Sequence, residues 1–504
     1  MQSLIYLRHM EHLLAAVDLG SNSFRLSVGR IELVNGLPHI YQIDRLKETV
    51  RLAAGLNDQK ILDDSSIERA ISVLHRFGER LDSFHPSRVR AVATNTFRVA
   101  RNTSDFLPRA ETALGFPIEV IAGKEEARLI YTGVNHTLPA SKNKRLIIDI
   151  GGGSTEVIIG IGDEPINLSS LYMGCVSYSR KFFPDGLVDA YRMRQAEMAA
   201  RREIEVITKP FKRLGWVEAY GSSGTAKALF AILQEGGFSS QGITAQGLKA
   251  LKEKLISEGR VIPSNLPGIK TDRTDVLLGG LAIMSAFFDE FGIEKMQTGD
   301  GALRLGVLVD LSGREESHDR RDESVKAFMK RYHVDARQAS RVKRTALALF
   351  DTLVQPNQTN QELRHSLSWA ADLHEIGMSI SRAGYHKHGA YILNHADMPG
   401  FSKVDQSLLA TLVVAHTSKL TRVQSALKNR SQWYAILALR LAVLLCRRRE
   451  ELSRLALRVK AENQHITATV DKKWLANHPL TDFSLHAEEA EWAKVGFDFS
   501  LMTA

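Results

Sequence analysis

The stretch AAVDLGSNSFRLSVGRIE (residues 15–32) has the pattern of an apolar strand, a tight polar turn and a second strand, which together make a hairpin. Gly, Ser and Asn are common in hairpin turns because they tolerate positive φ or bond their own backbone. Such a turn also exposes backbone N–H groups, which can form a concave anion-binding site. In that interpretation Asp18, at the end of the first strand, faces a phosphate or its metal. One hairpin leaves both interpretations open.

The chain repeats this pattern, and the repeat favours the functional interpretation. RLIIDIGGGSTEVIIGI (residues 145–161) is again an apolar strand, Asp, small residues and a second strand. A third loop, in AYGSSGTAKALF (residues 219–230), lies between a short strand and a helix, where free N–H groups and the helix dipole favour an anion. The chain lacks G-x-x-x-x-G-K-[ST], which argues against a P-loop NTPase. Three such loops predict two related α/β domains that bind phosphate.

Composition limits the class of protein. A chain of 504 residues is expected to contain three or four domains, and its net charge of +9 favours polyanionic partners. No nucleic-acid-binding motif accompanies the basic clusters, so we expect no nucleic-acid partner. The 2 cysteines cannot form a disulfide framework, which fits a cytoplasmic protein. No apolar run is long enough to span a membrane, and YAILALRLAVLLC (residues 434–446) contains an arginine and predicts a buried helix.

The secondary-structure pattern changes along the chain and predicts four domains. Residues 1–130 and 131–312 alternate strands and helices, with helices expected over 64–81, 103–114 and 192–214. The polar stretch SGREESHDRRDES (residues 312–324) predicts a linker. Residues 313–451 fit helical periodicity, and residues 452–504 regain alternation, which predicts a small β-containing C-terminal domain.

The order DLGSNSF, DIGGGSTE, GSSGT resembles the superfamily of acetate kinase, sugar kinases, Hsp70 and actin, in which two ribonuclease-H-like domains close over polyphosphate. Within it, the motifs VRLAAGLN, GKEEARLIYTGV, YMGCVS and GDGALRLGVL are similar to those of the exopolyphosphatase and guanosine pentaphosphate phosphohydrolase family. The resemblance runs from residue 15 to the C-terminal WLANHPL. It implies an α/β fold of two ribonuclease-H-like, actin-like domains, followed by a helical HD-like domain and the small C-terminal domain.

Hydrolysis of a terminal phosphoanhydride needs bound phosphate oxygens, an in-line water and a group that orients or deprotonates it. Mg²⁺ prefers carboxylate oxygens completed by water and phosphate, so Asp149 and Glu156, which flank the second hairpin turn, are candidate metal-associated residues. The family resemblance strengthens that role for Glu156, and Asp18 could contribute through water from the opposite domain. The predicted phosphate-binding residues are Ser21, Asn22, Ser23, Arg98, Gly151, Gly152, Gly153, Ser154, Thr155, Gly221, Ser222 and Ser223.

The resemblance also implies individual roles. Glu126 would polarise the attacking water as the base, and Arg98 would reach the phosphates. Glu125 is explained as an acid that complements the dipole of a first helical turn. Leu305 stands where the family usually has Glu, so we expect an acidic group near the loops to be lost.

The helical region contains His365, His374, His386 and His388 and resembles a degenerate HD-phosphohydrolase domain. Glu375 replaces the aspartate of the His-Asp pair, so we assign these histidines no catalysis and expect packing, hydrogen-bonding or substrate-contact roles.

Two substrates remain open. VRLAAGLN and WLANHPL are more similar to the guanosine pentaphosphatase branch, whereas the third Gly of DIGGGSTE is more similar to the exopolyphosphatase branch. We expect guanosine pentaphosphate as the main substrate, inorganic polyphosphate as a second one, Mg²⁺ as cofactor and a homodimer. A primarily processive exopolyphosphatase is the alternative. A small-molecule kinase or an Hsp70-like ATPase fits less well, because the added part is helical.

Overall fold

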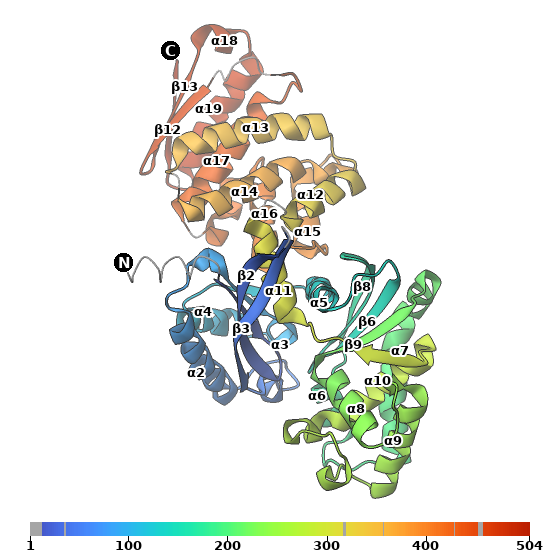
Figure 1. Cartoon of the computed structure of the whole chain (residues 1–504). Coiled ribbons are helices and arrows are strands. Elements are labelled where there is room, and N and C mark those ends of the chain that lie inside the picture. The colour runs from blue at the N-terminus through green and yellow to red at the C-terminus, as the bar shows by residue number, and fades with distance from the viewer. Residues whose placement is uncertain are drawn as a thin grey trace. The chain divides into compact units, whose positions relative to one another are not determined.

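The computed structural model describes residues 13–34, 37–315, 319–355, 357–427, 429–451 and 457–503. The chain divides into two compact units, Met1–Asp319 and Arg320–Ala504. The first unit contains all three predicted loops and consists of two α/β lobes with two helices between them (Figure 1).

Lobe I is built on a five-stranded sheet of order β3-β2-β1-β4-β5. The first three strands are antiparallel, and β4 and β5 continue the sheet in parallel with β1. Asp63 caps the helix predicted over 64–81, because its side chain accepts a hydrogen bond from the Ser66 N–H. The apolar face of this helix packs on the sheet. The elements are β1 (Leu13–Leu19), β2 (Ser23–Val34), β3 (Leu37–Thr49), α2 (Asp64–Leu81), β4 (Val89–Ala93), α3 (Asn95–Val99), α4 (Thr103–Leu114) and β5 (Ile118–Val120).

Lobe II repeats the strand order in a six-stranded sheet, β10-β11-β9-β6-β7-β8. In both lobes, a hairpin at the centre of the sheet carries the Asp-containing turn. The elements are β6 (Lys144–Ile150), β7 (Thr155–Ile161), β8 (Glu164–Leu171), α6 (Cys175–Phe182), α7 (Ala190–Leu214), β9 (Glu218–Ser222), α8 (Ser223–Glu235), β10 (Ile243–Thr244), α9 (Ala245–Glu258), α10 (Leu277–Phe291) and β11 (Lys295–Thr298).

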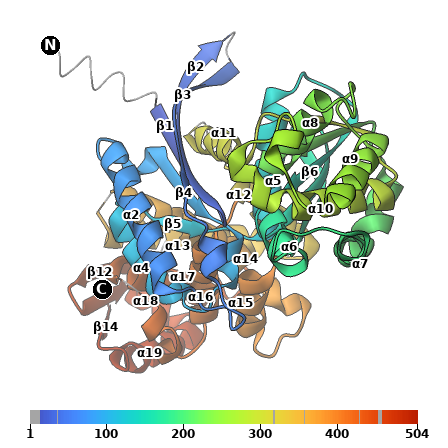
Figure 2. The same ribbon diagram turned by 90° about the horizontal axis from the view of Figure 1, so that it is seen from below.

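Helices α5 (Gly123–Thr137) and α11 (Leu303–Glu315) lie between the two sheets, as Figure 2 shows. One hydrophobic core joins them to both sheets, with Val92 from lobe I and Ile147 from lobe II among its members. The two helices approach closely because their contact is made by glycines: a Cβ added at Gly306 would collide with the carbonyl oxygen of Leu129. This packing ties the position of α5 to that of α11.

The polar stretch at residues 312–324, predicted as a linker, contains the boundary between the two units, and most of its described residues are helical. Helix α11 continues to Glu315, and α12 begins at Arg320. Apolar residues earlier in α11, such as Leu308 and Leu311, are buried and carry the helix into the polar stretch. Residues 316–318 of the predicted linker lie outside the described residues.

The second unit is helical up to residue 451 in its described part, as predicted, and ends in a three-stranded sheet of order β12-β13-β14. The apolar helix expected over 434–446 is confirmed as the largely buried α17. One hydrophobic core contains residues of both the helices and the small sheet. The elements are α12 (Arg320–Arg331), α13 (Ala336–Leu353), α14 (Gln358–Leu373), α15 (Tyr385–His395), α16 (Lys403–Ala415), α17 (Arg430–Leu445), β12 (Leu457–Glu462), β13 (His465–Val470), α18 (Lys472–Ala476), α19 (Pro479–Ala493) and β14 (Asp498–Thr503).

Within the described residues, no helix combines the length and the apolar character that crossing a membrane requires.

Candidate active site

The turns of the two central hairpins face each other across a cavity in the first unit. A Cβ added at Gly152 would lie 3.4 Å from the Cβ of Ser21 and 3.7 Å from that of Asn22. The turn between β1 and β2 and the turn between β6 and β7 therefore meet, although they belong to different lobes. Twelve of the predicted site residues line this cavity: Asp18, Ser21, Asn22, Ser23, Glu126, Asp149, Gly151, Gly152, Gly153, Ser154, Glu156 and Ser223.

Four predicted residues lie outside the lining of this cavity. Thr155 is fully buried and its hydroxyl donates to the carbonyl oxygen of Met173, at 2.7 Å. Ser222 is likewise buried and donates to the Gly301 carbonyl oxygen, at 3.1 Å. Gly221 lies within β9, and Arg98 contacts the cavity through Glu126.

The third loop brings the start of α8 to the cavity. Ser223, the first residue of α8, has a left-handed backbone with φ of 73°, which is unfavourable for a residue other than glycine. Its hydroxyl donates to the Ile150 carbonyl oxygen, at 2.9 Å, and the hydroxyl of Thr225 donates to the same oxygen, at 3.0 Å. Both bonds hold the α8 N-terminus against the end of β6, so the positive end of its dipole lies beside the second hairpin turn.

The two hairpins differ in the residue that stands opposite the aspartate. Asp18 pairs in register with Arg25, whereas Asp149 pairs with Glu156. The pKa of Asp18 is raised by burial, and the nearby cations Arg304 and Arg25 oppose the shift. Burial also raises the pKa of Asp149, to about 6. The second hairpin therefore places two buried acids opposite each other. In the first hairpin, by contrast, nearby arginines offset the charge of the one aspartate.

Glu156 is a further buried carboxylate of the cavity. Only 1% of it is exposed, and its Oε1 accepts a hydrogen bond from the Ser170 hydroxyl, at 2.8 Å. Burial raises the pKa of Glu156 well above its ordinary value, and the negative charges of Glu126 and Asp149 add to the shift. A cation bound beside these acids would offset the repulsion between them.

Glu126 lies in the first turn of α5, at the junction of the two lobes, and lines the cavity. Its Oε2 accepts a hydrogen bond from Nη1 of Arg98, at 2.7 Å, and both side chains are largely buried. Burial raises the pKa of Glu126, while the Arg98 guanidinium opposes the shift. Arg98 therefore helps to keep this carboxylate ionised.

The structure corrects the sequence interpretation of Glu125, which explained this residue only as an acid that complements the helix dipole. It is 2% exposed and, besides its place in the first turn of α5, it belongs to a buried ion-pair network. Its two oxygens accept from Nε and Nη2 of Arg128, both at 2.8 Å. An acid that only complemented the helix dipole would not need to be buried with a bidentate partner.

The donor set at the second hairpin fits Mg²⁺. Among the described residues, no group of three or more His, Cys, Asp or Glu side chains is close enough to hold a metal. Mg²⁺ does not need such a group, because it usually takes one or two carboxylates and completes its shell with water and substrate phosphate. Asp149 and Glu156, opposite each other in register, offer such a pair.

Three arginines that the sequence interpretation missed also line the cavity: Arg25, Arg273 and Arg304. Arg304 lies at the start of α11, where its Nη1 is 3.6 Å from Oδ2 of Asp18 and its Nε donates to the Ser27 hydroxyl, at 3.0 Å. Arg25 could have been found from the hairpin register, since it stands opposite Asp18. Arg273 has no local signal, because its place depends on the packing of a distant segment.

A second, basic cavity adjoins the first. The two share Arg25, Ser223, Gly224, Arg273, Ala302 and Arg304 in their linings. The second cavity adds four cations and two acids to these, namely Arg45, Lys47, Lys227, Lys270, Asp272 and Asp300. Two of the cations are paired, Lys47 with Asp272 at 2.7 Å and Lys227 with Asp300 at 3.0 Å. The excess of arginine and lysine gives this side of the site a positive character.

Leu305 does not line either cavity, although its neighbours Leu303 and Arg304 do. The Leu305 side chain is half-buried on α11.

The predicted histidines of the second unit differ in their surroundings. His374 is 1% exposed, with Nδ1 2.7 Å from the Ala371 carbonyl oxygen, and its ring packs edge-on against His416. Burial lowers the pKa of His374, so the ring is neutral at neutral pH. His365 is exposed and lies beside Trp369, while His386 and His388 are half-buried on α15.

These features define a class of protein: a two-lobed fold of the actin type in which two hairpin turns and a carboxylate at the junction of the lobes line one cavity. The pattern of the Ppx/GppA phosphatase family matches residues 31–315, and that of domain III of the same family matches residues 320–489. The chain therefore belongs to the Ppx/GppA phosphatase family and is a hydrolase that acts on phosphoanhydrides. The predicted family and fold class are confirmed.

Solved structures agree with this assignment. A Ppx/GppA family member from Aquifex aeolicus is 26% identical, with a TM-score of 0.50, over 61% of this chain and 99% of its own. An exopolyphosphatase from Cytophaga hutchinsonii is 22% identical, with a TM-score of 0.53, over 60% of this chain and 98% of its own. At that identity, the second similarity supports the fold alone.

Proposed function

We propose that the enzyme removes the terminal 5′-phosphate of guanosine pentaphosphate, and that it also hydrolyses inorganic polyphosphate. The observation that carries this proposal is the continuity of the two cavities, which share Arg25, Arg273 and Arg304. A terminal phosphate bound between the hairpin turns can extend its remaining phosphates into the basic cavity, where arginine and lysine offset their charge.

In this proposal the hairpin turns and the α8 N-terminus bind the terminal phosphate through backbone N–H groups. Asp149 and Glu156 would hold Mg²⁺, with Asp18 nearby through water, and the bound ion would neutralise charge on the phosphate oxygens. Arg25 and Arg304 lie on the opposite side and bind oxygens of the same substrate. Arg98 acts on the phosphate site through Glu126, its direct partner in the structure.

The reaction is attack of water on the terminal phosphorus. Glu126 accepts a proton from this water as the new P–O bond forms, and the bond to the bridging oxygen of the next phosphate breaks. The products are orthophosphate and a shortened substrate. The ion pair with Arg98 fixes the orientation of the Glu126 carboxylate, so its second oxygen is available to the water.

A primarily exopolyphosphatase function is the second candidate. The basic cavity has no feature that requires a guanine base, and a linear chain of phosphates would use the same lysines and arginines. Kinase and Hsp70-like functions are set aside, because the chain belongs to a phosphatase family.

One experiment separates the two substrates. Phosphate release is measured on a single preparation with guanosine pentaphosphate and with long-chain polyphosphate, in the presence of Mg²⁺. The proposal expects a higher kcat/KM for guanosine pentaphosphate and measurable release from polyphosphate. A higher kcat/KM for polyphosphate would favour the second candidate, and failure to release phosphate from either would contradict both.

The proposal includes a cytoplasmic homodimer. The two free cysteines, Cys175 and Cys446, are both buried, which supports a reducing compartment. Light scattering of the full chain measures the oligomeric state.

A further inference from the structure

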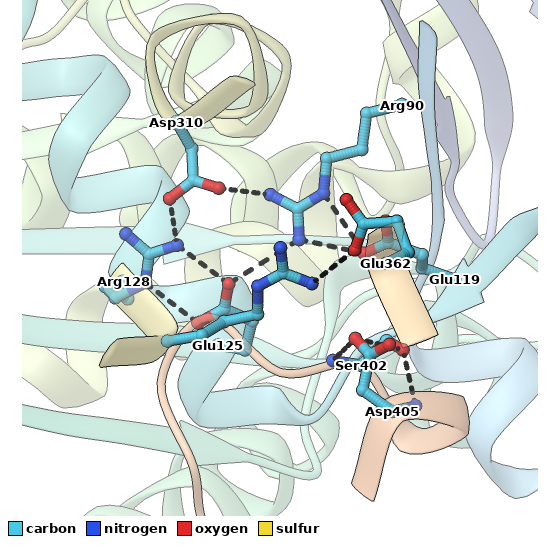
Figure 3. A network of polar contacts seen from close by, with 9 residues as sticks. Arg90, Glu119, Glu125, Arg128, Asp310, Glu362, Ser402 and Asp405 are labelled. Atoms are coloured by element: carbon cyan, nitrogen blue, oxygen red, sulfur yellow. Dashed lines mark hydrogen bonds and ion pairs between the residues drawn. The ribbon is translucent and has the colours of Figure 1, made fainter. Parts of the chain in front are cut away.

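A buried ion-pair network joins the first turn of α5 to three other elements of the first unit, β4, β5 and α11 (Figure 3). Its members in this unit are Arg90, Glu119, Glu125, Arg128 and Asp310. Arg90 on β4 donates through Nε and Nη2 to Oε2 of Glu119 on β5, at 3.1 and 2.9 Å. Its Nη2 is 3.7 Å from Oε1 of Glu125. Its Nη1 donates to Oδ2 of Asp310 on α11, at 2.7 Å.

Asp310 accepts a hydrogen bond from each of the two arginines. While Oδ2 accepts from Arg90, Oδ1 accepts from Nη2 of Arg128 on α5, at 2.5 Å. Figure 3 shows the two carboxylate oxygens directed toward the two different guanidinium groups. A single side chain of α11 therefore connects the lobe I sheet to α5.

Stability alone would not require this network of buried charges. The side chains of Arg90 and Glu125 are 1% exposed, and those of Arg128 and Asp310 are 6% exposed. Removing charges from water is costly, and well-packed apolar residues often replace a buried ion pair with equal or better stability. What apolar residues would not provide is fixed direction, because forked guanidinium–carboxylate pairs set the angle between their elements.

The first turn of α5 needs such fixing, because it lacks a side-chain cap. Its N-cap residue is Ala122, which makes no side-chain capping bond, and the helix opens with Gly123. Glu125 and Glu126 are consecutive, so their side chains point about 100° apart around the helix. Glu125 is held by Arg128 and Arg90, and Glu126 is thereby directed toward Arg98 and the cavity.

Helix α11 is subject to the same constraint. It carries Arg304 in the cavity lining and Asp310 in the network. Because α5 and α11 also touch through their glycines, the network and the glycine contact together leave little freedom for either helix to rotate.

We propose that Asp310 and Arg90 are positioning residues for the hydrolytic reaction, which hold the first turn of α5 so that Glu126 faces the bound phosphate. The inference rests on the proposed role of Glu126 as the base. Neither residue contacts the substrate cavities, and both act through Glu125 and Arg128.

The first test is Asp310→Asn in the full chain, assayed with guanosine pentaphosphate and with long-chain polyphosphate. Misplacing a catalytic group by a fraction of an ångström to 1 Å can cost up to about 100-fold in rate. We expect kcat to fall on the order of 10- to 100-fold on the better substrate, with KM within about twofold. Glu68→Gln is the matched control, because Glu68 forms an exposed ion pair with Arg109 in the same lobe.

A double-mutant cycle separates positioning from a general loss of structure. In a Glu126→Gln background, Asp310→Asn should lower kcat by less than about twofold further, because it acts through a group already removed. An equal fractional loss in both backgrounds would overturn the proposal, as would a folded Asp310→Asn with the kcat of Glu68→Gln. A fully active Glu126→Gln would contradict the proposed function, whereas an inactive Glu126→Gln beside an unimpaired Asp310→Asn would contradict only this inference.

If circular dichroism shows that Asp310→Asn is not folded, Glu119→Gln takes its place in the same double-mutant cycle. Glu119 is the most exposed member, at 23%, so its loss is better tolerated. A fall in kcat of about threefold that vanishes in the Glu126→Gln background supports the proposal. No fall, or the same fall in both backgrounds, overturns it.

Discussion

The two central hairpins have the same turn and opposite electrostatics. In the first, Asp18 stands opposite Arg25, and Arg304 lies within 3.6 Å of its carboxylate. In the second, Asp149 stands opposite Glu156, which raises the density of buried negative charge. The backbone of both turns can bind phosphate oxygens, but only the second hairpin offers two carboxylates to a cation. The repeated motif therefore has an arginine beside its aspartate in lobe I and a second acid beside it in lobe II.

We infer a division of labour from this difference. In the proposed function, Arg25 of lobe I and Arg304 of α11 bind the substrate anion beside the first hairpin, with Arg273 of lobe II nearby, and Asp149 and Glu156 of lobe II would hold Mg²⁺. Glu126, at the junction of the lobes, lines the cavity and in the proposed function acts on the attacking water.

The largest effect is expected at the junction. Glu126→Gln keeps the shape of the side chain but cannot accept a proton, so turnover should fall by about 10²- to 10⁴-fold while substrate binding persists. Single-turnover kinetics and a binding measurement check this, with Glu68→Gln as the exposed control. Turnover near the wild-type rate would show that another group activates the water.

A smaller effect is expected on the anion-binding side. Arg25→Gln removes a cation that lines both cavities, so KM should rise about tenfold, the cost of one charge-assisted contact, with a lesser change in kcat. Arg30→Gln is the control, because Arg30 lies on the same strand and pairs with Glu32 at the surface. If the two variants have the same KM, Arg25 does not bind the substrate.

A third effect concerns stability without metal. The pKa of Asp149 is about 6 in the folded protein against 3.8 for the ordinary group, because the carboxyl is buried. Between these values the folded state binds more protons, so the stability that depends on Asp149 falls as the pH rises through this window. Asp149→Asn, which mimics the protonated form, should therefore be more stable than wild type above pH 6, by on the order of 2–3 kcal/mol.

Urea unfolding of both proteins in the presence of a chelator, from pH 4 to pH 8, measures this difference. The two curves should converge toward the acidic end. A difference that stays constant with pH would mean that Asp149 titrates alike in the folded and unfolded states.

Local patterns were enough to predict much of this fold. The helices expected over 64–81 and 103–114 have those bounds, because their apolar periodicity and the residues that flank them act within a few positions. The hairpins were predictable for the same reason, and their register places Arg25 and Glu156 opposite the two aspartates. The end of α11 was not predictable from composition, since a polar segment continued a helix anchored by buried leucines.

The surroundings of the site depend on contacts between distant positions. Glu125 and Glu126 are adjacent and chemically alike, and only the packing of α5 shows that one joins a network and the other lines the cavity. Arg90 and Asp310 are 220 positions apart, a separation at which no local pattern predicts contact. Thr155 and Ser222 have the residue type expected of phosphate ligands, yet their hydroxyls donate to backbone carbonyl oxygens.

The most direct test of the division between the hairpins is the affinity for Mg²⁺, measured by calorimetry on the wild-type, Glu156→Gln and Arg25→Gln proteins. Each variant replaces the residue opposite the aspartate by the same amide, in one hairpin or the other. The account predicts that Glu156→Gln weakens Mg²⁺ binding by about tenfold or more, whereas Arg25→Gln leaves it equal or tighter. Unchanged Mg²⁺ affinity in Glu156→Gln, together with a loss in Arg25→Gln, would contradict it.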